Sequence, residues 1–141
     1  MRSILLVEPH ADTSDLYSGY LRLHGFDVHT ACTTDEARAS APAADLIVME
    51  THLPASADGL ALIHSMRRDG VTRRVPIVVV SAGAYREDAI RAAMAGCDLF
   101  LVKPCLPTEL LRSVRRLLRR SAARRIAKAV ASAEHHRQQP A

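Results

Sequence analysis

Tryptophan is absent from this sequence of 141 residues, and aromatic residues make up only 4% of it. The hydrophobic core must therefore be built almost entirely from aliphatic side chains. A chain of this length suits a single domain that buries about 68% of the surface its unfolded form exposes. Such a domain needs neither a disulfide nor a structural metal for its stability.

Cysteine is scarce, and long apolar runs are missing. Cys32, Cys97 and Cys105 are odd in number and have no CxxC spacing, which favours reduced thiols in a cytosolic protein over a disulfide framework. No apolar run approaches the roughly 18 residues of a membrane-spanning helix. The start MRSILLVEP lacks a cleavable signal pattern. We therefore expect a cytoplasmic protein with no membrane span.

Acidic residues almost disappear from the C-terminal part of the chain. Residues 1–104 contain 10 Lys or Arg and 13 Asp or Glu, a net charge of −3, whereas residues 105–141 contain 9 and 2, a net charge of +7. The basic character of the protein therefore belongs to its C-terminal segment.

Five short apolar runs alternate with helical patterns along the chain. Each run is too far from the next for a hairpin, so the pattern predicts βαβ units with right-handed crossovers. The expected fold class is α/β, with a five-stranded parallel sheet covered by helices on both faces. The expected strands are residues 3–7, 26–31, 46–49, 75–80 and 99–102.

The first expected helix lies between the first two strands. Asp12, Thr13 or Ser14 can cap its start, and Gly25 can end it. Its inward stripe is expected to consist of Leu16, Tyr20, Leu21 and Leu23.

Caps and glycines also place the next three helices. The second begins after Thr33 or Thr34, and the fourth spans about 86–95 and closes at Gly96. The third starts at Asp58-Gly59. Its side chains are expected to divide into an inward set, Leu60, Leu62, Ile63 and Met66, and an outward set, Arg67, Arg68 and Asp69.

Polar side chains stand at the ends of four of the expected strands: Glu8, Glu50, Ser81 and Lys103. In open α/β sheets, ligands and chemistry lie in the crevice outside the carboxyl ends of the strands. Two carboxylates, a hydroxyl and an ammonium at one edge suit a phosphoryl group handled with a divalent cation. The alternative is that each side chain caps its neighbouring loop or helix. His10 and His52 are expected near the mouth of this pocket but show no paired metal spacing.

Several motifs together resemble the receiver domain of bacterial response regulators: ILLVE, DLIVM followed by an acid and LP, DG, VVVSA and LVKP. The resemblance covers residues 3 to about 120. It implies a flavodoxin-like doubly wound sheet with strand order 2-1-3-4-5. In that family the aspartate four residues before the proline accepts phosphate from a histidine kinase, and two acids after the first strand bind Mg²⁺. Lys103-Pro104 resembles the family's cis-proline junction.

The match to the family's functional residues is partial. Glu8 occupies the first acidic position, but Pro9 stands where a second acid would be, and Glu50 stands at the phosphoacceptor position. Ser81 and Lys103 match the switch hydroxyl and the lysine that sense the phosphoryl group. Phe100 matches the aromatic position that moves on activation. The loop 54–58 is one residue longer than the usual spacing.

These departures determine the predicted mechanism. The extra methylene of Glu50 displaces its carboxylate by more than about 1 Å, a misplacement that can cost about 10²-fold in rate. We therefore predict no phosphorylation at Glu50 and a weak or absent Mg²⁺ site at Glu8 and Glu50. Two consequences stay open. Either Glu50 contacts Lys103 and Ser81 as an incomplete stand-in for phospho-aspartate, or the pocket is inert and the domain is a constitutive scaffold.

A long helix is expected from Pro107 to about residue 133. The residues of its docking stripe are Leu110, Leu111, Val114, Leu117 and Leu118, and the apolar spacing continues through Ala122, Ile126 and Val130. The basic residues of its other face are Arg112, Arg115, Arg116, Arg119, Arg120, Arg124, Arg125 and Lys128. This basic face is open to three interpretations: a solvated surface, a contact with a protein partner or second copy, or binding of nucleic acid or an anionic membrane surface.

The sequence thus predicts a receiver-like domain over residues 1–120 and a basic helical extension over 121–141, with HHRQQPA disordered at its end. We expect an atypical, stand-alone, non-enzymatic receiver in two-component signalling. It would act on a signalling partner or histidine kinase, or as a homodimer, through its fourth helix, fifth strand and fifth helix. The alternatives are a conventional phosphoacceptor receiver and a small nucleic-acid-binding adaptor that uses the arginine-rich tail.

Overall fold

The protein forms a five-stranded parallel sheet in a computed structural model that describes residues 1–138, apart from the side chain of Ser56. The strand order is β2-β1-β3-β4-β5, which confirms the predicted doubly wound topology. The strands are β1 (Ser3–Val7), β2 (Asp27–Ala31), β3 (Leu46–Met49), β4 (Ile77–Ser81) and β5 (Leu99–Val102). The predicted fourth strand began two residues too early, because Pro76 has no N–H to donate to the sheet.

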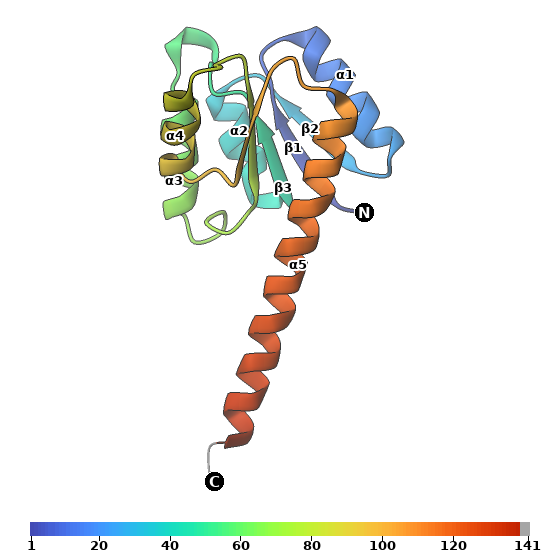
Figure 1. Cartoon of the computed structure of the whole chain (residues 1–141), viewed down its shortest axis with the longest axis vertical. Coiled ribbons are helices and arrows are strands. Elements are labelled where there is room, and N and C mark those ends of the chain that lie inside the picture. The colour runs from blue at the N-terminus through green and yellow to red at the C-terminus, as the bar shows by residue number, and fades with distance from the viewer. Residues whose placement is uncertain (139–141) are drawn as a thin grey trace.

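Helices cover both faces of this sheet (Figure 1). One face packs against α1 and α5, and the other packs against α2, α3 and α4. The helices are α1 (Ala11–Leu23), α2 (Thr34–Ser40), α3 (Gly59–Arg68), α4 (Arg86–Ala95) and α5 (Pro107–Gln138), with short 3-10 turns at Ala41–Ala43 and Pro54–Ser56. Within residues 1–138, no helix has the length and apolar character needed to cross a membrane.

The central strands are buried on both sides, as the near-continuous apolar runs predict. Along β1, Ile4 and Leu6 pack with α1 and α5, while Leu5 and Val7 pack with the helices of the opposite face. This alternation follows from the two-residue period of a strand. The core is aliphatic, as expected from the shortage of aromatic residues.

The start and the inward face of α1 differ from the prediction. The helix begins at Ala11 after His10, and no side chain caps it. Leu16 and Leu23 are exposed, whereas Tyr17 and Leu21 are buried. The Tyr17 hydroxyl donates a hydrogen bond of 2.7 Å to the Cys105 carbonyl oxygen, and burial raises the pKa of Tyr17 to about 12. This contact with the segment before α5 determines which of two apolar faces of α1 turns inward.

The last helix projects far beyond the body of the domain (Figure 1). Its predicted docking stripe is confirmed, because all five residues of the stripe are buried: Leu110, Leu111, Val114, Leu117 and Leu118. The helix extends to Gln138, so the prediction of disorder was wrong for residues 135–138, while residues 139–141 lie outside the described part of the chain. Beyond Leu118 the apolar positions Ile126 and Val130 are exposed. Residues 121–138 continue the helix without a break, and the domain boundary after residue 120 stays a prediction.

The loop between β3 and α3 carries two local features. Asp58 caps α3 by accepting a hydrogen bond from the Leu60 N–H, as its position predicted. The next residue must be a glycine, Gly59, because a Cβ atom at this position would lie 2.6 Å from the Cα atom of Thr51. Ala55, within the longer loop, adopts the left-handed conformation with φ of 59°. The first turn of α3 is thereby held against the residue that follows Glu50.

Candidate functional site

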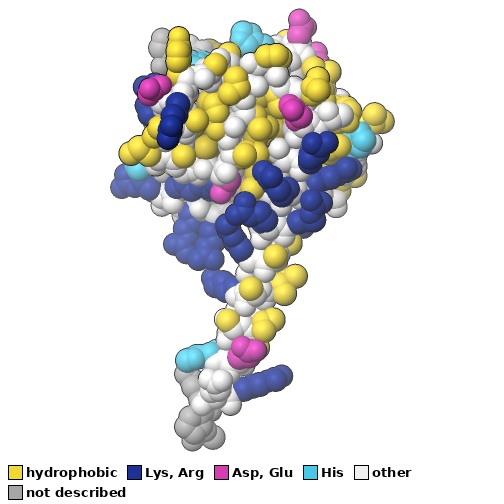
Figure 2. Space-filling model, viewed as in Figure 1, with side chains coloured by type: hydrophobic (Ala, Val, Ile, Leu, Met, Phe, Trp, Pro, Cys, Tyr) yellow, Lys and Arg dark blue, Asp and Glu magenta, His cyan; other side chains and the backbone are white. Residues whose placement is uncertain are grey.

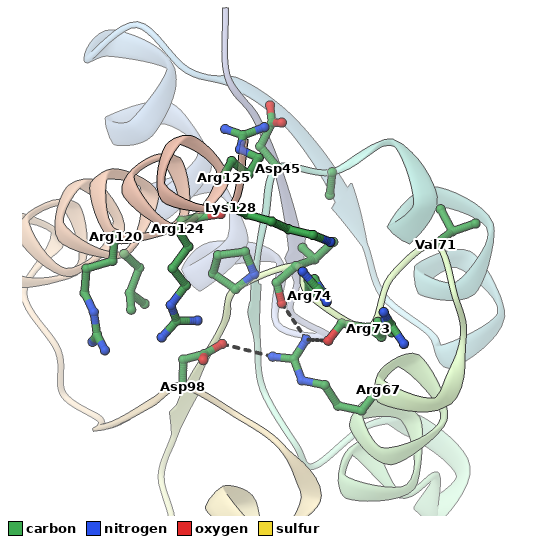
Figure 3. Close-up of a pocket in the computed structure, with 15 residues that line it drawn as sticks. Asp45, Arg67, Val71, Arg73, Arg74, Asp98, Arg120, Arg124, Arg125 and Lys128 are labelled. Carbon is green, nitrogen blue, oxygen red and sulfur yellow. Dashed lines mark hydrogen bonds and ion pairs between the residues drawn. The ribbon is translucent and has the colours of Figure 1, made fainter. Parts of the chain in front are cut away.

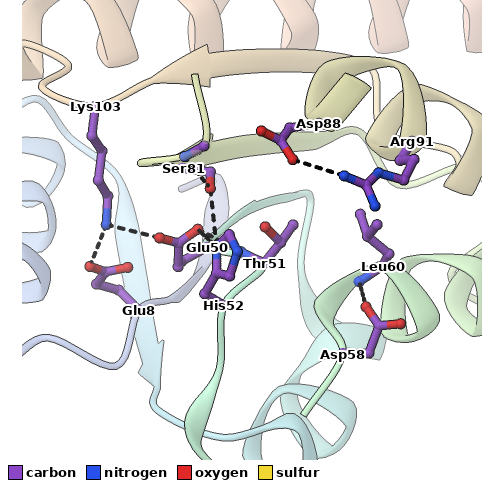
Figure 4. Close-up of polar contacts among 11 residues, drawn as sticks. Glu8, Glu50, Thr51, His52, Asp58, Leu60, Ser81, Asp88, Arg91 and Lys103 are labelled. Atoms are coloured by element: carbon purple, nitrogen blue, oxygen red, sulfur yellow. Dashed lines mark hydrogen bonds and ion pairs between the residues drawn. The ribbon is translucent and has the colours of Figure 1, made fainter. Parts of the chain in front are cut away.

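Four predicted residues meet at the carboxyl edge of the sheet (Figure 4). Glu8 and Glu50 continue the strand ladder by one residue, because their N–H groups donate to Ala31 and Val7. The Lys103 N–H donates in the same way to the Ser81 carbonyl oxygen. The parallel strands therefore fix the backbone from which each side chain enters the site. The Lys103–Pro104 peptide bond is cis, as predicted.

Lys103 joins the two carboxylates. Its Nζ atom lies 2.8 Å from Oε1 of Glu8 and 3.5 Å from Oε1 of Glu50. Both glutamates are buried, with only 3% and 5% of their surface exposed. Buried carboxylates need a paired cation because their desolvation is costly. The lysine ammonium supplies that cation from within the chain.

The other oxygen of Glu50 is also engaged. Its Oε2 atom accepts a hydrogen bond of 2.8 Å from the Thr51 N–H and lies 3.7 Å from Nδ1 of His52. His52 is largely exposed and stands at the mouth of the site, where the sequence placed it. Both oxygens of the carboxylate at the phosphoacceptor position are thus held by contacts within the chain.

Ser81 lies beside the cluster without a hydrogen bond to Glu50. Its hydroxyl oxygen accepts a hydrogen bond of 3.2 Å from the Gly83 N–H and lies 3.5 Å from Nδ1 of His52. A stand-in for phospho-aspartate was expected to contact both Lys103 and Ser81. Glu50 contacts Lys103 but not Ser81. The bond to Gly83 turns the hydroxyl toward the loop that follows β4.

Phe100 is half-buried and lines a pocket of about 540 Å³ next to this cluster. The pocket lies between the β3–α3 loop and α4, and His52, Ser81 and Asp88 are also among its lining residues. Phe100 packs against the buried core on the side of α2, α3 and α4. The aromatic side chain thus lies between the core and the mouth of the site, and its predicted switch role stays a prediction.

The basic residues of α5 do not form one continuous face. Arg120, Arg124, Arg125 and Lys128 line a second pocket at the opposite edge of the sheet. The remaining basic residues predicted for this helix, Arg112, Arg115, Arg116 and Arg119, are exposed and lie outside that pocket. Three further arginines come from α3 and the loop after it: Arg67, Arg73 and Arg74. Sequence reasoning missed this grouping, although the paired arginines after Gly70 were a signal for it.

The thiols near these sites differ in exposure. Cys32 is exposed and Cys105 is buried. Burial raises the pKa of the Cys105 thiol, and the neighbouring Glu109 carboxylate raises it further. Because the thiolate is the reactive form, we expect iodoacetamide at pH 8 to alkylate Cys32 at least about tenfold faster than Cys105. Peptide mass spectrometry over time measures both rates, and equal rates in the native protein would contradict the burial of Cys105.

A doubly wound sheet with an acid, a hydroxyl and a lysine at its carboxyl edge has the architecture of a receiver-type domain. The chain belongs to the response regulator receiver domain family, whose model matches residues 4–115. Receiver domains of this family function in two-component signalling and interact with histidine kinases and other signalling partners.

Individual relatives agree with this assignment. The phosphate regulon transcriptional regulatory protein PhoB of Escherichia coli (strain K12) is 31% identical over 121 residues, which are 84% of this chain and 52% of that protein. The receiver domain of sensor histidine kinase PA1611 from Pseudomonas aeruginosa PAO1 is 31% identical, with a TM-score of 0.75 over 83% of this chain and 97% of that domain. A CheY-like receiver domain protein from Methanospirillum hungatei JF-1, 22% identical, shares the fold with a TM-score of 0.81 over 88% of this chain and 98% of that one. The chain thus spans about half the length of the curated relatives that it matches.

The residues at the carboxyl edge offer a magnesium ion fewer carboxylates than the family pattern does. The PA1611 receiver domain was solved with a magnesium ion coordinated in its active site cleft. Here Pro9 offers no carboxylate, and both Glu8 and Glu50 already face the Lys103 ammonium. Among residues 1–138, no group of three His, Cys, Asp or Glu side chains is arranged to hold a metal ion. Mg²⁺ prefers oxygen ligands in octahedral geometry, and the proline at position 9 removes one such ligand from the family pattern.

Proposed function

We propose that this receiver domain signals through protein contacts and does not accept a phosphoryl group at Glu50. The observation that carries the proposal is that Glu50 stands at the phosphoacceptor position, with its carboxylate 3.5 Å from the Lys103 ammonium, while Pro9 replaces the second metal-binding acid. In-line attack on a phosphorus atom needs a free, aligned oxygen and a cation that neutralises the developing charge. Here the lysine occupies one Glu50 oxygen and the Thr51 N–H occupies the other.

We favour a fixed state held by Lys103 over complete mimicry of phospho-aspartate. A phosphoryl group offers three oxygens and close to two negative charges, while Glu50 offers two oxygens and one charge. The missing bond between Ser81 and Glu50 supports this choice, because the hydroxyl is satisfied by Gly83 instead. The domain would then present one surface to its partner without a phosphorylation step.

The surface that supports a protein partner lies on α4, β5 and the start of α5. Four large apolar side chains are exposed there: Ile90, Met94, Val102 and Leu106. Of these, Met94 is 81% exposed, on a helix whose opposite side packs on the core. An exposed apolar patch on a folded domain marks a site of protein contact. The partner would be a histidine kinase, another signalling protein or a second copy of this chain.

Treatment with acetyl phosphate and Mg²⁺ tests the proposal. We expect intact mass spectrometry to show no stable adduct of about 80 Da, the mass of one phosphoryl group, on the wild-type chain. The double variant Pro9→Asp/Glu50→Asp restores both carboxylates of the family pattern, so we expect it to be labelled. Glu50→Gln in the Pro9→Asp background is the matched control and should stay unlabelled. A stoichiometric wild-type adduct that disappears in Glu50→Gln would overturn the proposal.

A further inference from the structure

The largest concentration of uncompensated charge lies far from the receiver site. A pocket of about 550 Å³ opens at the amino ends of β3, β4 and β5, between α5 and the loop that joins α3 to β4 (Figure 3). Strands of four or five residues separate this edge from the carboxyl edge, a distance of roughly 15 Å. The pocket is therefore independent of Glu50 and of the proposed function.

Positive charge dominates the lining of this pocket. Seven Arg or Lys side chains face two carboxylates, a net charge of +5. The two carboxylates are already engaged: Asp45 accepts a hydrogen bond from the Ser3 N–H, and Asp98 binds Arg67. The other six cations form no ion pair within the described residues: Arg73, Arg74, Arg120, Arg124, Arg125 and Lys128. Figure 2 shows Lys and Arg side chains gathered where α5 leaves the body.

The helix brings like charges together without a counter-ion. Arg120, Arg124 and Lys128 are spaced four residues apart, so they stack on one side of α5. Like-charge pairs at this spacing destabilise a helix. Arg73 and Arg74 add their charges from across the pocket. An anion bound between the helix and the loop would offset this repulsion.

The chemistry and the size of the pocket indicate the kind of anion. Arginine donates paired N–H groups that match the oxygens of phosphate. Apolar side chains also line the pocket, including Val71, Pro76 and Leu117, and Val71 is 67% exposed. A volume of about 550 Å³ lies within the range of small-ligand pockets. A ligand with several phosphates and one flat apolar group would satisfy both parts of the lining.

We propose that this pocket binds a small polyphosphorylated ligand of the nucleotide class. The phosphates lie between the α5 side chains and Arg73 and Arg74, while the base contacts the apolar part near Val71 and Pro76. The walls formed by α5, the α3–β4 loop and the sheet edge surround a volume of small-molecule size. An extended nucleic acid strand would use an open groove instead.

Calorimetric titration of the full chain with ATP at about 150 mM salt, where long-range attraction is screened, tests this proposal. We expect saturable binding of one ATP per chain. The variant Arg73→Ala/Arg74→Ala/Arg124→Ala should bind at least about 100-fold more weakly, because it loses three charged donors. These three side chains are exposed and unpaired, so the variant should keep its fold, which circular dichroism checks. The matched control Arg112→Ala/Arg115→Ala/Arg116→Ala removes the same number of positive charges, all from the part of α5 outside the pocket, and should bind ATP as the wild type does.

Two further probes separate the nucleotide class from other phosphate sources. Inorganic tripolyphosphate should bind more weakly than ATP, because it has no group for the apolar part of the lining. Any single-stranded oligonucleotide that these arginines hold should be displaced by ATP. The proposal is overturned by any of four results: no ATP binding, equal weakening in the two triple variants, tripolyphosphate binding as tight as ATP, or oligonucleotide binding that ATP does not displace.

Discussion

Replacing Lys103 by methionine is expected to destabilise the fold by about 3 kcal/mol or more, since breaking a buried ion pair leaves an uncompensated charge. Methionine keeps most of the length and apolar surface of the lysine stem but removes its ammonium. Glu8 and Glu50 would then be two buried carboxylates at one edge of the sheet with no cation between them. Urea denaturation of wild type and variant at pH 7.5 measures the difference in free energy of unfolding.

A second substitution isolates the charge effect. Glu50→Gln alone leaves Lys103 paired with Glu8, so we expect a smaller loss of stability than in Lys103→Met. In the double variant Lys103→Met/Glu50→Gln, one of the unpaired carboxylates is gone, so part of the lost stability should return. The two substitutions should thus be non-additive, as expected for residues in direct contact. Additive effects would mean that the Lys103–Glu50 distance of 3.5 Å reflects no energetic coupling.

The strands, and the polar residues that follow them, could be predicted from the sequence because local patterns of apolar and polar residues indicate both. The buried run of β3, Leu46–Met49, and the apolar run of β5, Leu99–Val102, agree with the structure at both ends. The parallel sheet then places the residues after each strand at one edge, which brought Glu8, Glu50 and Lys103 together as expected. No distant contact was needed for these inferences.

Tertiary contacts determine which side chains of α1 and α3 face inward, and local sequence patterns left this open. The apolar residues of α1 could form more than one inward stripe, and the choice of Tyr17 over Leu16 depends on a carbonyl group 88 residues away. The long polar side chain of Arg67 was predicted to face outward with Arg68. Instead, only 20% of the Arg67 side chain is exposed. Its partners lie in the loop directly after α3 and in the α4–β5 loop, and the sequence alone does not place the second loop near α3.

Arg67 connects three segments at the amino edge of the sheet. Its guanidinium donates hydrogen bonds of 2.8 Å to the Gly96 carbonyl oxygen, 2.6 Å to that of Val75 and 3.2 Å to that of Arg73. It also pairs with Asp98 at 2.9 Å. Gly96 has φ of 120°, and a Cβ atom there would lie 2.6 Å from Cγ of Arg67, so the glycine makes room for the arginine.

We expect Arg67→Met to lower the free energy of unfolding by about 3 kcal/mol, because it leaves several carbonyl groups and the Asp98 carboxylate without their donor. For a chain of this size, that loss corresponds to a fall of roughly 10 °C in Tm. Arg67→Lys should recover little of it, since a single ammonium cannot reach partners that the planar guanidinium contacts in several directions. Thermal and urea denaturation measure both variants.

The neighbouring arginine offers the matched control. Arg68 is exposed and makes no hydrogen bond or ion pair within the described residues, so Arg68→Met should change stability by no more than about 0.5 kcal/mol. The contrast between adjacent positions separates the hydrogen-bond network from the general loss of one positive charge on α3. An Arg67→Met variant as stable as Arg68→Met, or full recovery in Arg67→Lys, would show that the network does not hold the α3–β4 loop. Because that loop carries Arg73 and Arg74, the stability of its Arg67 contacts also determines how firmly the two arginines face α5 across the pocket.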